Sequence, residues 1–337
     1  MQAFINYVSI YLPQKKLTNQ DLNFDFPEWS VDKISNKTGI FERSISQNNE
    51  FVSDMAIHSA INLFKEHNIN KDQIDFILLC TQSPDYFLPT TACIVQDKLG
   101  LSTNCGALDF NLGCSGFVYG LALANGLISS HIARNILLIT SETYSKHINI
   151  KDKSNRTIFG DAAAACLISS NYNKGACKIN NFVLGTDGKG AENLIVKNGG
   201  LRNIKKDGID EYLDKDFIKN DNNLYMNGQE IFKFTTMAVP KLVDDCLIKN
   251  NLTLDEIDLF IFHQANKFML DYIRRKLDIP PEKFFMHFEN IGNTVSSTIP
   301  IALYEALIKG KIGERGKRVL VAGFGVGYSY AATILEF

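Results

Sequence analysis

The feature that most constrains the fold of this chain is an internal repeat. Two distant segments, MAIHSAINLFKEHNINKDQIDFILLC and MAVPKLVDDCLIKNNLTLDEIDLFIFH, each combine a helical pattern, a polar turn, an Ile-Asp pair and an apolar strand pattern. DFNLGCSGF around Cys114 then matches FENIGNTVS around Asn293, and FGDAAAACLI matches FGVGYSYAATIL. One such pair can arise by chance, but several in the same order favour duplication. We therefore predict two halves, residues 1–171 and 172–337.

Strand and helix patterns alternate through both halves. The clearest strand patterns cover residues 76–80, 136–140, 259–262 and 319–322, and a helical pattern covers 117–130. This alternation predicts an α/β fold in layers. Duplicated halves are related by a pseudo-twofold axis, which can bring corresponding helix starts together. We therefore expect Cys114 and Asn293 to meet between the halves.

Composition excludes several classes of function. The formal net charge of -2 gives no general attraction to nucleic acid or to an anionic membrane. The seven cysteines contain no CxxC pair, so neither a disulfide framework nor a zinc site is predicted. Residues 112–130 are uncharged and long enough to span a bilayer, but their glycines and serines favour a buried helix. Without a basic leader and apolar stretch, the expected location is the cytoplasm.

Three residues carry the chemistry that we expect. Cys114 lies in a small-residue turn before a helical pattern, where backbone N–H groups and the helix dipole favour a thiolate. His263 ends an apolar strand, where its side chain can emerge into a cleft, although single histidines are often structural. Asn293 follows a glycine turn; helix capping is its alternative role, and its match to Cys114 favours a catalytic one.

The sequence GFGVGYSY near the C-terminus is rich in glycine but lacks the rest of a nucleotide-binding fingerprint. We expect its backbone N–H groups to face an oxyanion. Residues 197–223 are rich in Lys, Asp, Asn and Gly and interrupt the strand-helix alternation. They are interpreted as a surface insertion or lid.

GCSGF, HQAN, IGNT and GFGVGYSY occur in this order, accompanied by KTGIFER, QSPDYFLPTTA and RTIFGDAAA. With this set the chain resembles the β-ketoacyl-[acyl carrier protein] synthase III family of the thiolase superfamily, from the first strand to Phe337. The resemblance implies a five-layered α/β/α/β/α fold with duplicated halves, working as a homodimer. It also implies an acyltransferase that needs no bound cofactor or metal and acts in fatty-acid or related acyl-chain synthesis.

The mechanism implied by the resemblance is a decarboxylative Claisen condensation. Cys114 attacks an acyl-CoA primer, and the N–H groups of Cys114 and Val326 hold the oxyanion. Malonyl-acyl carrier protein then binds, and His263 and Asn293 stabilise the enolate formed by loss of carbon dioxide. Asn293 distinguishes this family from the related elongation synthases, which have a second histidine there, and from thiolases, which have a second cysteine.

The resemblance also implies binding residues. Trp29 corresponds to a residue that stacks on the CoA adenine, with an ordinary buried tryptophan as the alternative. Lys37 and Lys153 fall near positions where family members have arginines that contact CoA phosphates. Asn266 is part of HQAN. Leu88 takes the position of an acyl-pocket gate that family members contribute across the dimer. The expected docking face for the acidic carrier protein, with a solvated helix face as the alternative, consists of Lys233, Lys267, Arg274, Arg275 and Lys276.

Three other functions stay open from the residues. Papain-like cysteine hydrolases also use Cys, His and Asn in this order, although their CGSCW-type signature is missing. An acyltransferase of the same fold that acylates an amine or a hydroxyl is compatible with Leu88 and the insertion at 197–223. A noncatalytic module that binds acyl carrier protein is disfavoured by the complete set of reactive residues.

Overall fold

The computed structural model describes residues 1–205, 208–213 and 217–337. Its centre is a nine-stranded sheet in the order β13-β14-β15-β8-β1-β7-β6-β4-β5. The strands of the first half are β1 (Phe4–Tyr11), β4 (Phe76–Cys80), β5 (Gly106–Phe110), β6 (Asn135–Glu142) and β7 (Ala162–Ser169). Those of the second are β8 (Cys177–Thr186), β13 (Leu259–Phe262), β14 (Arg318–Gly325) and β15 (Ser329–Glu336). The predicted strands at 76–80 and 259–262 match β4 and β13.

The two ends of this sheet repeat one topology. From the outside inward, the first half runs β5-β4-β6-β7-β1 and the second runs β13-β14-β15-β8. Phe284 forms a parallel bridge to Phe260 of β13, in the position that β5 occupies beside β4. The halves join where β1 and β8 pair antiparallel. The predicted division at 171/172 falls between β7 and β8 and stays a prediction.

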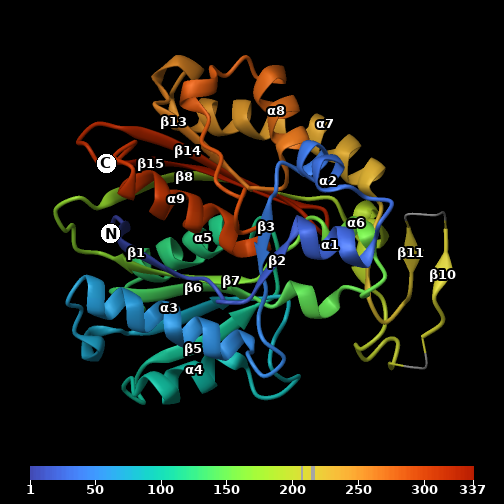
Figure 1. Cartoon of the computed structure of the whole chain (residues 1–337). Coiled ribbons are helices and arrows are strands. Elements are labelled where there is room, and N and C mark those ends of the chain that lie inside the picture. The colour runs from blue at the N-terminus through green and yellow to red at the C-terminus, as the bar shows by residue number, and fades with distance from the viewer. Residues whose placement is uncertain (206–207, 214–216) are drawn as a thin grey trace.

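Alternating side chains of the strands define the layers. Ile77 and Leu79 of β4 pack with α3 (Val52–Glu66) and α4 (Thr91–Leu99), whereas Leu78 packs with α5 (Gly116–Ser129) and α9 (Thr298–Ile308). In β13, Ile261 faces α5 and α9, and Phe260 faces α7 (Gly228–Asn250) and α8 (Lys267–Lys276). Strands covered on both faces read as continuous apolar runs. The predicted five-layered α/β/α/β/α arrangement is confirmed (Figure 1).

The uncharged run at 112–130 contains α5, which packs between the two halves of the sheet together with α9. Two helices buried from both sides need no charged face, and this explains the composition of the run. Within the described ranges, no helix is long and apolar enough to cross a membrane.

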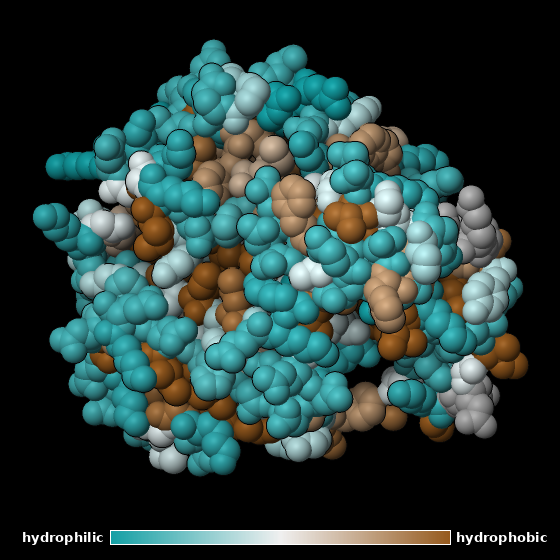
Figure 2. Space-filling view, in the orientation of Figure 1, coloured by the Kyte–Doolittle hydropathy of each residue, from teal (hydrophilic) through white to brown (hydrophobic). Residues whose placement is uncertain are grey.

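Smaller elements surround the sheet, and the surface that faces the viewer is mostly hydrophilic with scattered hydrophobic patches (Figure 2). Residues 197–223 contain a short hairpin, while 206–207 and 214–216 of that predicted insertion lie outside the described residues. The short strands are β2 (Lys16–Thr18), β3 (Glu42–Ser44), β9 (Leu194–Val196), β10 (Glu211–Tyr212), β11 (Ile218–Lys219) and β12 (Leu224–Met226). The short helices and 3-10 turns are α1 (Asn19–Asp25), α2 (Val31–Thr38), α6 (Lys153–Arg156), η1 (Lys71–Gln73), η2 (Tyr144–His147), η3 (Gly188–Asn193), η4 (Leu254–Glu256), η5 (Pro281–Lys283) and η6 (Val295–Ser297).

Candidate active site

Cys114 lies in the turn between β5 and α5 and is 6% exposed. Two glycines of β14 let the turn approach the strand: a Cβ on Gly323 would lie 2.6 Å from the Cys114 carbonyl oxygen, and one on Gly325 would lie 2.8 Å from its Sγ. The backbone N–H groups of Val326 and of Cys114 itself act on the sulfur to lower the pKa of the thiol. The two N–H groups that are predicted to form the oxyanion hole therefore both act at the sulfur of Cys114.

The acidity of Cys114 differs from the expectation. Burial raises the pKa of the thiol to about 12, and the carboxyl of Glu142 adds to this, although the hydrogen bonds from Val326 and Cys114 oppose it. The sequence showed the helix start, which favours a thiolate, but not the depth at which the sulfur is buried. In the free protein Cys114 is therefore a protonated thiol near neutral pH.

His263 follows β13, and its backbone N–H donates to the carbonyl of Ala322 in the neighbouring strand at 2.8 Å. Its Nδ1 lies 2.8 Å from the Thr298 hydroxyl. Burial lowers the pKa of the imidazole to about 3, against a smaller opposing effect of the Val295 carbonyl. The ring is therefore neutral at physiological pH and offers one N–H donor.

Asn293 is fixed by a bridge to the first half of the chain. Its backbone N–H donates to Ile158 at 2.9 Å, and its carbonyl accepts from Gly160 at 3.0 Å. Its side-chain oxygen accepts from the Val295 N–H at 2.9 Å, so the local turn does use the amide. Because the oxygen is engaged, the NH2 group is the part of the amide that can donate into the cavity.

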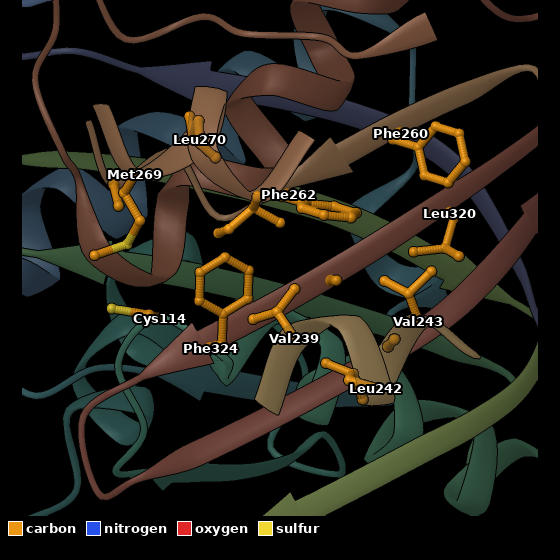
Figure 3. Packing of buried hydrophobic residues seen from close by; sticks show 14 of the residues in the cluster. Cys114, Val239, Leu242, Val243, Phe260, Phe262, Met269, Leu270, Leu320 and Phe324 are labelled. Carbon is orange, nitrogen blue, oxygen red and sulfur yellow. The ribbon is translucent and has the colours of Figure 1, made fainter. Parts of the chain in front are cut away.

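The three predicted residues line one cavity. It has a volume of about 510 Å³, and its wall includes Cys114, His263 and Asn293. Figure 3 shows Cys114 beside Phe324 and across from Met269, both of which also line the cavity. Most of the other lining residues are apolar, as for an acyl chain; they include Ile158, Phe159, Leu194, Leu213, Phe217, Tyr225, Met226 and Ile231. A sulfur, an imidazole and an amide from both halves thus meet as expected.

The chemistry of this cavity suits acyl transfer. It joins a nucleophile, two backbone donors at that nucleophile and two neutral side-chain donors in an apolar chamber. Lys37 is the one lining residue with a fixed charge in the described part of the chain. The described residues contain no cluster of His, Cys, Asp or Glu that could hold a metal ion.

Comparison with known proteins gives the same result over the whole chain. Residues 108–188 match the family model of 3-oxoacyl-[acyl-carrier-protein (ACP)] synthase III, and residues 247–337 match the model of its C-terminal part. The β-ketoacyl-[acyl-carrier-protein] synthase III of Clostridium perfringens is 37% identical over 327 residues, which are 97% of each chain. This chain belongs to the 3-oxoacyl-[acyl-carrier-protein] synthase III family.

Solved structures of this family superpose closely. A 3-oxoacyl-(acyl-carrier-protein) synthase III is 45% identical with a TM-score of 0.96 and full coverage of both chains. The synthase III of Thermus thermophilus is 32% identical with a TM-score of 0.86, covering 99% of this chain and 98% of the other. The match to this family over nearly the whole chain, together with the fold, excludes the papain-like hydrolase that the sequence had left open.

Trp29, the residue predicted to stack on the adenine in this synthase III chain, is buried. The indole is 1% exposed and packs with Leu22, Phe26 and Ile34, and two ammonium groups, those of Lys33 and Lys37, lie 4.7 and 4.6 Å from the ring centroid. The two exposed lysines cover the ring, and its stacking on an adenine stays a prediction. The position of Trp29 is that of an ordinary buried tryptophan, which was the alternative to adenine stacking. The sequence could not distinguish the two because they differ only in how the ring packs.

The other predicted binding residues are placed as follows. Lys37 lines the cavity, whereas Lys153 forms an ion pair with Glu28. Asn266 lines the cavity and also caps α8, since its side-chain oxygen accepts from the Met269 N–H at 3.0 Å. Leu88 is 86% exposed and does not line the described cavity of a single chain, so its role as a gate across a dimer stays a prediction.

The predicted docking residues do not form one face. Lys233 and Lys267 are exposed on the neighbouring helices α7 and α8. Arg274 instead donates to the Ile279 carbonyl at 3.0 Å, and Lys276 donates to the Thr236 carbonyl at 2.7 Å. Arg274, Arg275 and Lys276 are consecutive on a helix and therefore point in three directions. Lys233, Lys267, Arg275 and Lys276 are all exposed, and Arg275, like Lys276, donates to a backbone carbonyl, that of Asp271 at 3.1 Å.

Several supporting residues were missed at the level of sequence. Arg43 is fully buried and donates to Asn19 and to the Thr157 carbonyl, beside the turn of Gly292 that carries Asn293. Glu142 is fully buried and accepts from the Gln82 N–H and from the hydroxyls of Ser83 and Ser296. Arg43 lies in KTGIFER, and Glu142 ends β6 just beyond the strand predicted at 136–140. Only packing shows which atoms the two side chains contact.

Proposed function

We propose that this protein condenses an acyl primer, held as a thioester on Cys114, with the malonyl group of malonyl-acyl carrier protein. The observation that carries this proposal is the shared cavity of Cys114, His263 and Asn293, with the N–H of Val326 at the sulfur. Family membership supports the same reaction, because the relatives are named as synthases that act on acyl carrier protein.

The first half-reaction is acylation. The sulfur of Cys114 attacks the carbonyl carbon of an acyl thioester, taken to be an acyl-CoA, and the tetrahedral oxyanion accepts from the N–H groups of Cys114 and Val326. The bond to the leaving thiol then breaks, and the thiol proton of Cys114 leaves with that group. Because burial keeps the free thiol protonated, the oxyanion donors act where charge develops and are not needed to hold a thiolate beforehand.

The second half-reaction is condensation. The thioester oxygen of the malonyl group accepts from the N–H of His263 and the NH2 of Asn293. Loss of carbon dioxide leaves an enolate, whose carbon attacks the acyl carbon on Cys114 and releases the sulfur. Two neutral donors suit this step, since they stabilise the enolate without giving up a proton, and the low pKa of His263 keeps its ring neutral.

Two partners follow from the same proposal. Lys233, Lys267 and Arg275 form the cationic surface on which an acidic carrier protein docks. The exposed run Tyr86, Phe87 and Leu88, with exposed fractions of 62%, 79% and 86%, is the surface covered by a second copy of the chain in a homodimer. Analytical ultracentrifugation tests the second point: wild type sediments as a dimer, and Leu88→Asp shifts toward monomer.

Intact-mass spectrometry tests the reaction. The protein is incubated with a series of acyl-CoAs, digested to locate the acyl group, and then mixed with malonyl-acyl carrier protein. The proposal expects acylation of Cys114, followed by its loss and the appearance of a β-ketoacyl carrier protein. Acylation that is discharged to an amine or a hydroxyl instead assigns the transferase activity, and absence of acylation of Cys114 by every thioester refutes the proposal.

A further inference from the structure

Gln264 is the residue of HQAN that does not line the cavity, whereas His263, Ala265 and Asn266 all do. It follows His263 directly, just beyond the end of β13, and it is 1% exposed. A buried carboxamide costs free energy unless its donors and its acceptor find partners. The partners of Gln264 therefore indicate what the side chain does.

The carboxamide of Gln264 is bound to two segments of the chain. Its Nε2 donates to the carbonyl of Phe262 at the end of β13 and to the carbonyl of Phe285 at 3.4 Å. Its Oε1 accepts from the backbone N–H of His287 at 2.7 Å. Gln264 thus joins the end of β13 to residues 285–287 and uses both its NH2 group and its carbonyl to do so.

These bonds continue a backbone pairing of β13. The Phe285 N–H donates to the carbonyl of Phe260, which precedes Phe262 on this strand (Figure 3), at 2.9 Å. The strand stops at Phe262, and the next hydrogen bonds, to Phe285 and His287, come from the Gln264 side chain. A carboxamide has the donor and the acceptor of a peptide group, so it can take the place of strand backbone here.

The first half makes the corresponding connection with backbone atoms. Counted from the two Ile-Asp pairs, Thr81 after β4 corresponds to Gln264. The Thr81 N–H itself donates to the carbonyl of Phe110 in β5 at 3.2 Å. In the second half the chain has already turned at this point, since the Ala265 N–H donates to the His263 carbonyl at 3.0 Å. The long side chain of Gln264 therefore spans a distance that the first half closes with its backbone.

The segment that Gln264 holds leads directly to Asn293. Its next residue, Phe288, is 2% exposed, and the Phe288 carbonyl accepts from the N–H of Gly292 at 2.9 Å, which closes a tight turn. Asn293 follows this turn immediately, so its position depends on where the segment lies. Gln264 therefore links the strand end that carries His263 to the turn that carries Asn293.

We propose that Gln264 is a positioning residue for condensation, because its carboxamide sets where the imidazole of His263 lies relative to the NH2 group of Asn293. This inference rests on the proposed function, in which both donors meet one thioester oxygen. A donor displaced by about 1 Å loses much of its effect on the enolate. Acylation depends instead on the N–H groups of Cys114 and Val326, and none of the three hydrogen bonds of Gln264 reaches them.

Gln264→Met tests this inference, because methionine has nearly the length of glutamine and makes none of the three hydrogen bonds. Acylation of Cys114 is measured by intact mass with an acyl-CoA, and condensation is measured over a range of malonyl-acyl carrier protein concentrations. We expect kcat for condensation to fall about tenfold to a hundredfold, while KM for the carrier protein and the acylation rate stay within about twofold. A kcat within about twofold of the wild type overturns the inference.

Gln96→Met is the matched control. Gln96 of α4 also donates to two backbone carbonyls, those of Leu101 at 2.6 Å and Ser102 at 3.3 Å, and it does not line the cavity. This exchange should change neither rate. Equal losses of condensation in the two methionine variants would contradict a role that is specific to Gln264.

A double-mutant cycle separates positioning from a general loosening of the fold. If Gln264 acts by placing Asn293, Gln264→Met slows condensation at least about tenfold in the wild type and less than about twofold in Asn293→Ala. Equal factors in the two backgrounds refute the inference. Should Gln264→Met fail to acylate, Gln264→Glu, which keeps an acceptor for the His287 N–H, is put through the same cycle and decides by the same criterion. A wild type that acquires no acyl group or forms no β-ketoacyl product refutes the proposed function instead.

Discussion

The Thr298 hydroxyl lies 2.8 Å from Nδ1 of His263 and 2.9 Å from the carbonyl of Val295. A hydroxyl donates one proton, so it can be directed to only one of these acceptors. When it donates to Nδ1, the neutral imidazole carries its proton on Nε2, the nitrogen that remains for the cavity. In the structure the hydroxyl donates to the Val295 carbonyl. Rotation of the hydroxyl toward Nδ1 is what would hold His263 in the tautomer that donates to an enolate.

Thr298→Val is therefore expected to slow condensation while leaving acylation of Cys114 unchanged. Valine keeps the shape of the side chain but removes the hydroxyl, so Nδ1 can no longer accept a hydrogen bond from this position. We expect a loss of about tenfold to a hundredfold in product formation, the range of a missing donor in a buried site. Single-turnover release of a preformed acyl enzyme by malonyl-acyl carrier protein measures this step. Thr298→Ser is the control, and a wild-type rate in Thr298→Val would disprove the assignment.

Gly325→Ala is expected to impair acylation. Its Cβ would lie 2.8 Å from Sγ and 2.9 Å from Cβ of Cys114, so the sulfur must move away from the Val326 N–H. We expect the acylation rate to fall at least about tenfold. The measurement is the rate at which the acyl adduct appears by intact mass.

Gly126→Ala is the matched control for that substitution. Gly126 lies in α5, the helix that follows Cys114, and a Cβ there would meet no atom within 4 Å. The exchange should leave acylation unchanged and stabilise the helix by roughly 0.5–1 kcal/mol, visible as a small rise in Tm. Equal acylation rates in both alanine variants would show that the space at Gly325 does not matter.

Glu142 predicts how stability depends on pH. Burial raises the pKa of its carboxyl to about 8, although hydrogen bonds from Ser296, Gln82 and Ser83 oppose the shift. Between the ordinary pKa and about 8 the folded state binds the proton more tightly than the unfolded state. The stability contributed by this group is thus complete at low pH and is lost as pH rises toward 8.

Chemical denaturation at pH 5 and pH 8 measures this effect in wild type and Glu142→Gln. The free energy of unfolding of the wild type is expected to fall by on the order of a few kcal/mol more than that of the variant over this interval. The buried carboxyl of Asp161, whose pKa is also raised by burial, is present in both proteins and acts on Glu142, so the difference reports Glu142 together with this interaction. Parallel losses in the two proteins would contradict the prediction.

The sequence predicted those parts of the structure that depend on local pattern and on the repeat. Strands β4 and β13 and helix α5 follow from apolar runs, and the meeting of Cys114 with Asn293 follows from duplication. Side-chain environment could not be predicted in this way. Burial raises the pKa of Cys114, where the sequence predicted a lowered one, and burial also covers Trp29. Neither effect can be predicted from the order of residues.

Partners far apart in the sequence were missed for the same reason. Thr298 faces His263 only because α9 packs against the end of β13, and Glu28 meets Lys153 only because α1, α2 and α6 come together. The insertion was predicted to be a lid, and Leu213 and Phe217 do line the cavity, though part of that segment lies outside the described residues.

The most direct test of a shared site separates the two half-reactions. His263→Ala and Asn293→Ala are each incubated with a donor thioester and then with malonyl-acyl carrier protein, and the acyl adduct on the Cys114 peptide is followed by mass spectrometry. Both variants should acquire the adduct at close to the wild-type rate and then retain it, because only enolate stabilisation is lost. Discharge of the adduct at the wild-type rate in both variants would contradict the account.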